Sequence, residues 1–111
     1  MTKVIRLADL KRRHRDIFFN RRELNQLLSL YSRRVARGEW RDYAIDHKPG
    51  MAVFSVFRHS HERPLYSIVK CTTGPDRPPD YVVLTGQKRL KLSKSIDDAL
   101  KVLDIQLRVV S

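Results

Sequence analysis

The sequence contains one cysteine, Cys71, so no disulfide can form within the chain. Long apolar runs are also missing, and none approaches the ~20 residues that a membrane-spanning helix needs. The N-terminal residues lack the continuous apolar segment and the small-residue cleavage site of a signal peptide. These absences favour a reducing cytoplasmic compartment and give no reason to expect a membrane partner.

Patterns that support catalysis are scarce as well. The chain has only 4 glycines, and none belongs to a phosphate-cradling loop. His59-Ser60-His61-Glu62 comes closest to a metal motif but lacks the three or four converging ligands of a zinc site. On a strand, Asp42 and Asp46 would lie roughly 13 Å apart at ~3.3 Å per residue, too far for a glycosidase pair. We therefore expect no catalytic residue, no metal and no cofactor.

Acidic residues are few compared with basic ones. Lys and Arg number 23 against 12 Asp and Glu, so the formal charge is +11. Such a surplus suggests a polyanionic partner such as nucleic acid or a ribonucleoprotein, although charge also keeps small proteins soluble. The basic charge begins in residues 1–15, which we expect to form a flexible arm. Residues 16–111 have the length and apolar content of one domain.

The clearest predicted element is a helix that begins after Asn20. Asn20 and Glu23 have the spacing of a capping box, and Gly38 is the natural residue to follow a helix that ends near Arg37. Apolar residues recur at helical spacing through this segment and form one stripe: Leu24, Leu27, Leu28, Tyr31 and Val35.

A hairpin is predicted next, from strands at residues 41–47 and 51–57. Lys48-Pro49-Gly50 is the turn signal between them. Pairing Lys48 with Met51 places Tyr43 opposite Val56 and Ile45 opposite Phe54, so that these four share a buried face. Because Pro-Gly prefers a type II turn, the sequence leaves this register open by one residue.

Further strands are predicted at residues 65–70, 81–85 and 90–92, and a short strand at residues 16–19 leads into the first helix. A second helix begins near Ser95, with Asp98 at capping-box spacing. Alternating Ile105, Leu107 and Val109 predict a final short strand. The order predicts a single two-layer α+β domain, with an antiparallel meander sheet, one helix before it and one after it.

Four sequence blocks carry a family resemblance. They are Arg22-Glu23-Leu24-Asn25, residues 38–46 with the only Trp, residues 54–58, and Glu62-Arg63-Pro64-Leu65-Tyr66. Over residues 18–109 the chain resembles a small uncharacterised bacterial family, domain of unknown function 2794. The loop at residues 71–80 departs from the family pattern. The resemblance implies a bacterial cytoplasmic protein and supplies no reaction, ligand or catalytic residue.

Two hypotheses for function remain, and each has its own residues. The first is binding of RNA or DNA, without reading of sequence, by a stripe of arginines that forms if the arm lies beside the first helix: Arg12, Arg13, Arg15, Arg22, Arg33 and Arg37. Three tyrosines could stack on bases, but their spacing on strands favours packing in the core. They are Tyr43, Tyr66 and Tyr81.

The alternative is a protein-interaction adaptor or regulator that uses Trp40, Phe57 and Arg58. Trp40 stands at a helix-to-strand corner, where we expect it to be half exposed, and Trp and Arg are enriched at binding hot spots. Phe57 and Val53 fall on the sheet face opposite Tyr43. Either the second helix covers that face, or it remains an apolar patch for a partner or a second subunit. The sequence leaves monomer and homodimer equally open.

Overall fold

The computed structural model describes residues 16–59, 63–72, 74 and 76–110, and for residues 105–110 it describes the backbone alone. The predicted arm at residues 1–15, together with Ser60, His61 and Glu62, lies outside the described residues. The helices and strands follow one another in the order α2 (Arg21–Ala36), β1 (Asp42–Lys48), β2 (Met51–Phe57), β3 (Tyr66–Cys71), β4 (Asp80–Thr85), β5 (Lys88–Ser93) and α3 (Ile96–Val110).

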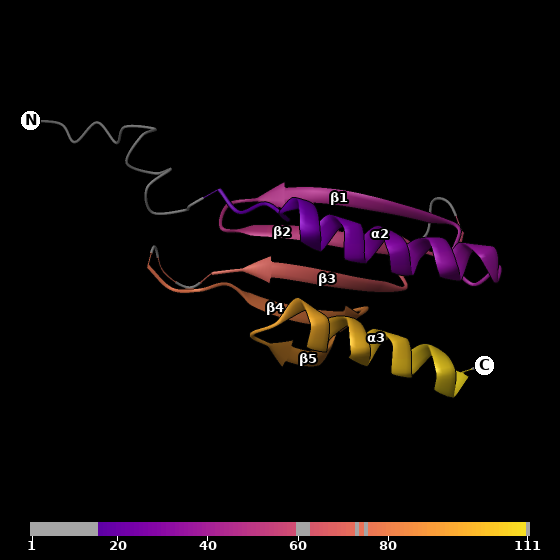
Figure 1. Cartoon of the computed structure of the whole chain (residues 1–111). Helices are drawn as coiled ribbons and strands as arrows, with labels where there is room; N and C mark the ends of the chain where they lie inside the picture. Colours follow the sequence, from indigo (N-terminus) through magenta and orange to yellow (C-terminus); the bar gives the residue numbers. More distant parts are fainter. Residues whose placement is uncertain (1–15, 60–62, 73, 75, 111) are drawn as a thin grey trace, which may run out of the picture.

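The strands form one five-stranded sheet in the order β1-β2-β3-β4-β5. Each strand pairs antiparallel with the next, so the sheet is a meander. Both helices lie on the same face of this sheet, α2 over the β1–β2 side and α3 over the β4–β5 side (Figure 1). The predicted α+β fold with two layers is confirmed.

Helix α2 begins as the capping box predicts. The Asn20 side chain accepts a hydrogen bond from the Glu23 amide at 2.8 Å, and Glu23 Oε1 accepts one from the Asn20 amide at 2.8 Å. Two backbone donors of the first turn are thereby satisfied. At the other end Arg37 is the C-cap, and Gly38 adopts a left-handed φ of 76° that suits glycine.

Of the registers that the sequence left open, the structure adopts the one in which Tyr43, Ile45, Phe54 and Val56 share a face. Lys48 pairs with Met51, Ile45 with Phe54 and Tyr43 with Val56. Gly50 closes the turn with a φ of 74°, a conformation that costs glycine little. The register sends one side of each strand toward the helices and the other side away from them.

Two predicted strands are wrong. Residues 16–19 form no strand, and Phe19 instead packs into the core just before α2. Residues 105–110 continue α3 as helix, where the alternating apolar residues had predicted a strand. Once Ile96, Ala99 and Leu103 have anchored the helix, each further residue adds a hydrogen bond to the turn before it, and this gain outweighs a short alternating pattern.

The core lies between the sheet and the two helices. Its buried apolar side chains form one cluster: Phe19, Leu27, Leu30, Trp40, Ala52, Phe54, Val56, Tyr66, Ile68, Tyr81, Val83, Ile96, Ala99 and Leu103. The cluster draws on both helices and on β2, β3 and β4. The domain is therefore stabilised mainly by residues far apart in the sequence.

Trp40 belongs to this core and is only 2% exposed, so the expectation of half exposure is wrong. The reason is the path of the chain after α2. The amides of Glu39 and Trp40 both donate to the carbonyl of Arg34, at 2.9 and 3.4 Å. This turn folds the chain back beneath the helix, where the Trp40 ring lies 6.3 Å from that of Tyr31.

The opposite face of the sheet has a different character. Since α3 covers the same face as α2, no described element covers the second one. We call this second face the open sheet face. Its apolar members alternate with the core residues along β2 to β5: Met51, Val53, Phe57, Val69, Cys71, Val82, Leu84 and Leu92.

Candidate functional site

A groove between the two helices is lined by three of the four arginines of α2. Arg21, Arg22 and Arg33 line it, and its volume is about 740 Å³. Its other lining residues are Asn25, Gln26 and Ser29 of α2 and Leu100 of α3. Arg22 and Arg33 are eleven positions apart, or about three helical turns, which places both on one side of α2. We call this hollow the helix groove.

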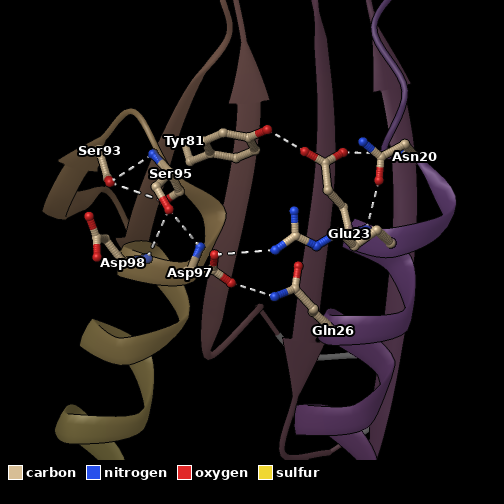
Figure 2. A network of polar contacts seen from close by, with 9 residues as sticks. Asn20, Glu23, Gln26, Tyr81, Ser93, Ser95, Asp97 and Asp98 are labelled. Carbon is tan, nitrogen blue, oxygen red and sulfur yellow. Dashed lines mark hydrogen bonds and ion pairs between the residues drawn. The ribbon is translucent and has the colours of Figure 1, made fainter.

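The helices run in the same direction, and an acidic residue of α3 joins them at their starts. Gln26 donates a hydrogen bond to Asp97 (Figure 2). The Arg22 guanidinium lies 3.7 Å from the same carboxylate. The Arg22 side chain is nevertheless 79% exposed. Asp97 therefore offsets only part of the positive charge of the groove.

The other two arginines have no such compensation. Within the part of the chain that the structure describes, no carboxylate pairs with Arg21 or with Arg33. Both side chains belong to exposed residues. The helix groove thus has a surplus of positive charge and guanidinium donors that remain accessible to a ligand.

The position of Arg21 at the start of α2, next to Arg22, argues against a purely structural role for Arg21. These two arginines are the first two residues of α2. The helix macrodipole places partial positive charge at this end, so cations there are disfavoured, typically by ~0.3–1 kcal/mol at a surface. Arg33 stands near the other end, where the dipole favours a cation. Arg21 therefore lacks a local reason for its charge, whereas Arg22 has the Asp97 carboxylate nearby.

The predicted nucleic-acid residues are only partly brought together. Arg22 and Arg33 both line the helix groove, whereas Arg37 is exposed at the C-cap and is not part of the lining. Arg12, Arg13 and Arg15 lie outside the described residues. The sequence analysis missed Arg21 and the amide and hydroxyl residues of the groove. The conflict between the charge of Arg21 and the helix dipole is a signal that could have found that residue.

The predicted protein-interaction residues do not form one surface. Trp40 is buried in the core, so its side chain is not available to a partner. Phe57 lies half-buried on the open sheet face, and Arg58 is exposed just after β2. Arg58 lines a separate hollow of about 560 Å³ with Arg63.

The tyrosines considered for base stacking are mostly core residues. Tyr66 and Tyr81 are buried, as their spacing predicted. Tyr43 is 40% exposed at the sheet edge, but its ring packs edge-on against Tyr31 at 4.8 Å and stacks on Phe54 at 5.5 Å. The Tyr43 ring is therefore already packed against two aromatic side chains of its own domain.

A buried polar cluster that the sequence did not reveal lies below the helix groove. The Glu23 carboxylate is 4% exposed and accepts hydrogen bonds from Lys70 Nζ at 2.7 Å and from the Tyr81 hydroxyl. Lys70 also donates to the Phe18 carbonyl at 2.9 Å. The cluster ties the start of α2 to β3 and β4, and Figure 2 shows its link to Tyr81.

The charges of this cluster are set by opposing effects. Burial raises the pKa of Glu23, but hydrogen bonds from Lys70, Tyr81 and the Asn20 amide outweigh it and hold that pKa below its ordinary value of 4.5. Burial and the neighbouring carboxylate raise the pKa of the Tyr81 hydroxyl well above its ordinary value. Glu23 is therefore ionised and Tyr81 protonated at neutral pH, which suits a structural clamp better than proton transfer.

A second buried cation joins the last turn of α2 to the middle of α3. The Arg34 side chain is 5% exposed and pairs with Glu39, whose Oε2 lies 3.3 Å away, and with Asp104 of α3. Arg34 thereby fixes the middle of α3 beside the last turn of α2. The sequence analysis did not single out Arg34 and missed this contact between the helices.

Ser95 caps the start of α3 as predicted, but Ser93 takes the place of Asp98 as the acceptor for the Ser95 amide. Ser95 Oγ accepts hydrogen bonds from the amides of Asp97 and Asp98 at 3.1 and 3.5 Å (Figure 2). Ser93 Oγ in turn accepts one from the Ser95 amide at 3.1 Å. This cap holds Asp97 beside α2, and it therefore helps to set the shape of the helix groove.

The described residues contain neither a metal site nor a membrane-spanning helix. Among the described residues, no group of three or more His, Cys, Asp and Glu side chains is placed to hold a metal ion. In that same part of the chain, no helix has both the length and the apolar character needed to cross a membrane.

One comparison with known proteins gives a result. The model of the family described as "Protein of unknown function (DUF2794)" matches residues 17–100. The chain belongs to this family. No curated protein and no solved structure matches the chain. The DUF2794 match contains every residue that lines the helix groove and leaves out residues 1–15, so the groove is part of the family domain.

Proposed function

We propose that this protein is a small non-catalytic binding protein that holds the phosphates of a nucleic acid, free or within a ribonucleoprotein, in the helix groove. One observation carries the proposal: three arginines line a single groove, and two of them have no carboxylate partner among the described residues. The formal charge of +11 favours the approach of any polyanion.

The chemistry of the groove suits phosphate. A guanidinium can bind two phosphate oxygens at once, which makes arginine the usual residue for such contacts. Arg22 and Arg33 are ~16 Å apart along the helix axis at ~1.5 Å per residue, so they engage two different phosphates. Asn25, Gln26 and Ser29 add neutral side chains of the kind that contact phosphate and sugar. None of these contacts reads a base, so the binding is independent of sequence.

The decisive comparison is between two double charge reversals. Arg21→Glu with Arg33→Glu alters the groove, and Arg58→Glu with Arg63→Glu alters the separate hollow near the end of β2. Each pair lowers the formal charge from +11 to +7, because every reversal removes two charges. The affinity of each protein is measured by fluorescence anisotropy with labelled duplex RNA, single-stranded RNA and duplex DNA.

The groove variant is expected to lose at least tenfold in affinity, about 1.4 kcal/mol, while the control pair loses clearly less. Circular dichroism checks that both variants are folded. Equal losses in the two variants would mean that the ligand senses only net charge, and the groove would then not be the binding site. If the wild-type protein binds none of the three ligands at near-physiological salt, the proposal is wrong.

A further inference from the structure

The open sheet face carries a row of apolar side chains that runs across four strands. The pairing places Val53 of β2 beside Val69 of β3, Val69 beside Val82 of β4, and Val82 beside Leu92 of β5. Leu92 is 50% exposed, and the three valines are half-buried. Contiguous apolar surface of this kind on a soluble domain marks an interaction site.

Charged residues frame this row unequally. Asp42 and Asp46 lie on the open sheet face of β1, since they pair with Phe57 and Val53. On the opposite edge, Arg89 of β5 pairs with Leu84 of the same face. No described cation pairs with Asp42 or Asp46. Lys48 lies on the same face of β1, paired with Met51, so the β1 edge carries one negative charge in excess, concentrated at Asp42 and Asp46, whereas the β5 edge is basic.

The two edge strands themselves are poorly suited to a partner strand. β1 ends in Asp46, His47 and Lys48, and β5 carries Lys88, Arg89 and Lys91. Charged residues on edge strands discourage edge-to-edge pairing. The apolar row is therefore best buried by a layer that stacks on the face of the sheet, as in a β-sandwich.

We propose that the occupant of the open sheet face is a second copy of this chain, stacked sheet to sheet about a two-fold axis parallel to β3. This axis lays β1 of one copy over β5 of its partner. Asp42 and Asp46 then approach the partner's Arg89, and the same contact repeats on the other side of the axis. An axis perpendicular to the strands would stack β1 on β1 and bring like charges together, which is unfavourable.

The size of the open sheet face sets the affinity that we expect for the dimer. Five strands at ~4.8 Å spacing and six residues at ~3.3 Å give a footprint of roughly 24 by 20 Å. This area is close to that of the smaller specific interfaces, for which weak association is usual. We therefore expect a dimer that dissociates in the micromolar range. Its helix grooves would lie on the two outer sides, so that one dimer presents two phosphate-binding surfaces.

The single cysteine allows a direct test of where the two-fold axis lies. Cys71 is in β3, the central strand, and it pairs with Met51 and Asp80 on the open sheet face. A two-fold axis parallel to β3 brings Cys71 opposite the partner's Cys71. Stacked sheets are ~10 Å apart, too far for a disulfide but within the span of a short bismaleimide. Burial and Asp80 raise the pKa of the Cys71 thiol, so the reaction needs a mildly alkaline buffer.

Sedimentation equilibrium of the full chain, over a wide range of concentration, tests the proposal. The expected mass at high concentration is twice 13.1 kDa. Val69→Asp should leave a monomer, whereas Ser32→Asp, at an exposed position of α2, should leave the dimer intact. Bismaleimide should join two copies of the wild-type protein and should fail to join the Val69→Asp variant.

Because Val69→Asp can also weaken folding, surface charges provide a second test. Arg89→Glu should raise the dissociation constant at least tenfold, and adding Asp42→Arg and Asp46→Arg should restore most of the affinity. A wild-type protein that stays monomeric overturns the proposal, whether the face is covered by residues 1–15 or by another protein. So does a dimer that tolerates both Val69→Asp and Arg89→Glu, or one in which the reversed charges give no recovery.

Discussion

The Tyr81 hydroxyl donates a hydrogen bond to Oε2 of Glu23 and so joins β4 to the first turn of α2 across 58 positions of sequence. Glu23 also completes the capping box through its other oxygen. One carboxylate therefore both begins the helix and holds it on the sheet. The helix groove depends on this contact, because Arg21 and Arg22 belong to the same first turn.

Removing the Tyr81 hydroxyl should destabilise the fold. Tyr81→Phe leaves one oxygen of a buried carboxylate without this donor, and hydrogen bonds to charged groups contribute about 1.5–3 kcal/mol. We expect the free energy of unfolding in urea to fall by about that amount. Tyr66→Phe is the matched control, because Tyr66 is also buried but its hydroxyl has no hydrogen-bond partner among the described residues. Equal losses in the two variants would contradict the assigned contact.

Stability should depend on pH through Glu23. Its pKa is lower in the folded protein than its ordinary value of 4.5, so the folded state favours the ionised form. The resulting stabilisation is complete above about pH 4.5 and is lost as the pH falls through the lower, folded pKa.

The check is urea unfolding of the wild-type protein and of Glu23→Gln between pH 7 and pH 3. Glu23→Gln should be less stable than the wild type at pH 7, and the difference should shrink as the pH falls below 4.5. A difference that stays constant over this range would show that ionised Glu23 does not contribute.

Trp40 should behave as a core residue in solution. Its side chain is 2% exposed, so the native fluorescence should resist quenching by iodide and should shift to longer wavelength on unfolding. Trp40→Ala should cost about 3–5 kcal/mol, as large core truncations do. Strong quenching in the native protein would mean that the ring is accessible to solvent.

Gly50 should contribute to stability only through its left-handed backbone conformation in the turn between β1 and β2. A Cβ at this position would meet nothing within 4 Å, but the φ of 74° strains any other residue. Gly50→Ala should therefore lower the free energy of unfolding by about 1 kcal/mol. Gly74→Ala is the control, since Gly74 has no left-handed φ and a Cβ there would make an ordinary contact at 3.7 Å with Arg77. A loss as large at Gly74 would contradict the backbone explanation.

Local patterns predicted the fold well where each signal acts over a few residues. The capping box at Asn20 and the turn at Gly50 follow from neighbouring side chains, and these left the register of β1 with β2 open by only one residue. The strand predicted from the alternating residues 105–109 was wrong because a local pattern does not show whether a preceding helix continues. Here the helix that begins at Ile96 continues through these residues.

The contacts that shape the candidate site could not be read in this way. The cluster of Glu23, Lys70 and Tyr81, and the pair of Arg34 with Asp104, join segments that only the tertiary fold brings together. The sequence also did not decide which face of the sheet α3 covers, because a core on both sides of the sheet and a sheet with one uncovered face fit the same pattern. Arg22 and Arg33 were predicted because helical spacing alone places them on one side of α2.

The salt dependence of nucleic-acid binding tests the central proposal most directly. The affinity for duplex DNA is measured at several salt concentrations for the wild-type protein and for Arg33→Gln. A phosphate-binding groove predicts a steep linear fall of log affinity with log salt, at ~0.9 per phosphate contact. The slope should decrease by about one contact in Arg33→Gln. A shallow slope, or a slope that Arg33→Gln leaves unchanged, would contradict phosphate binding in the helix groove.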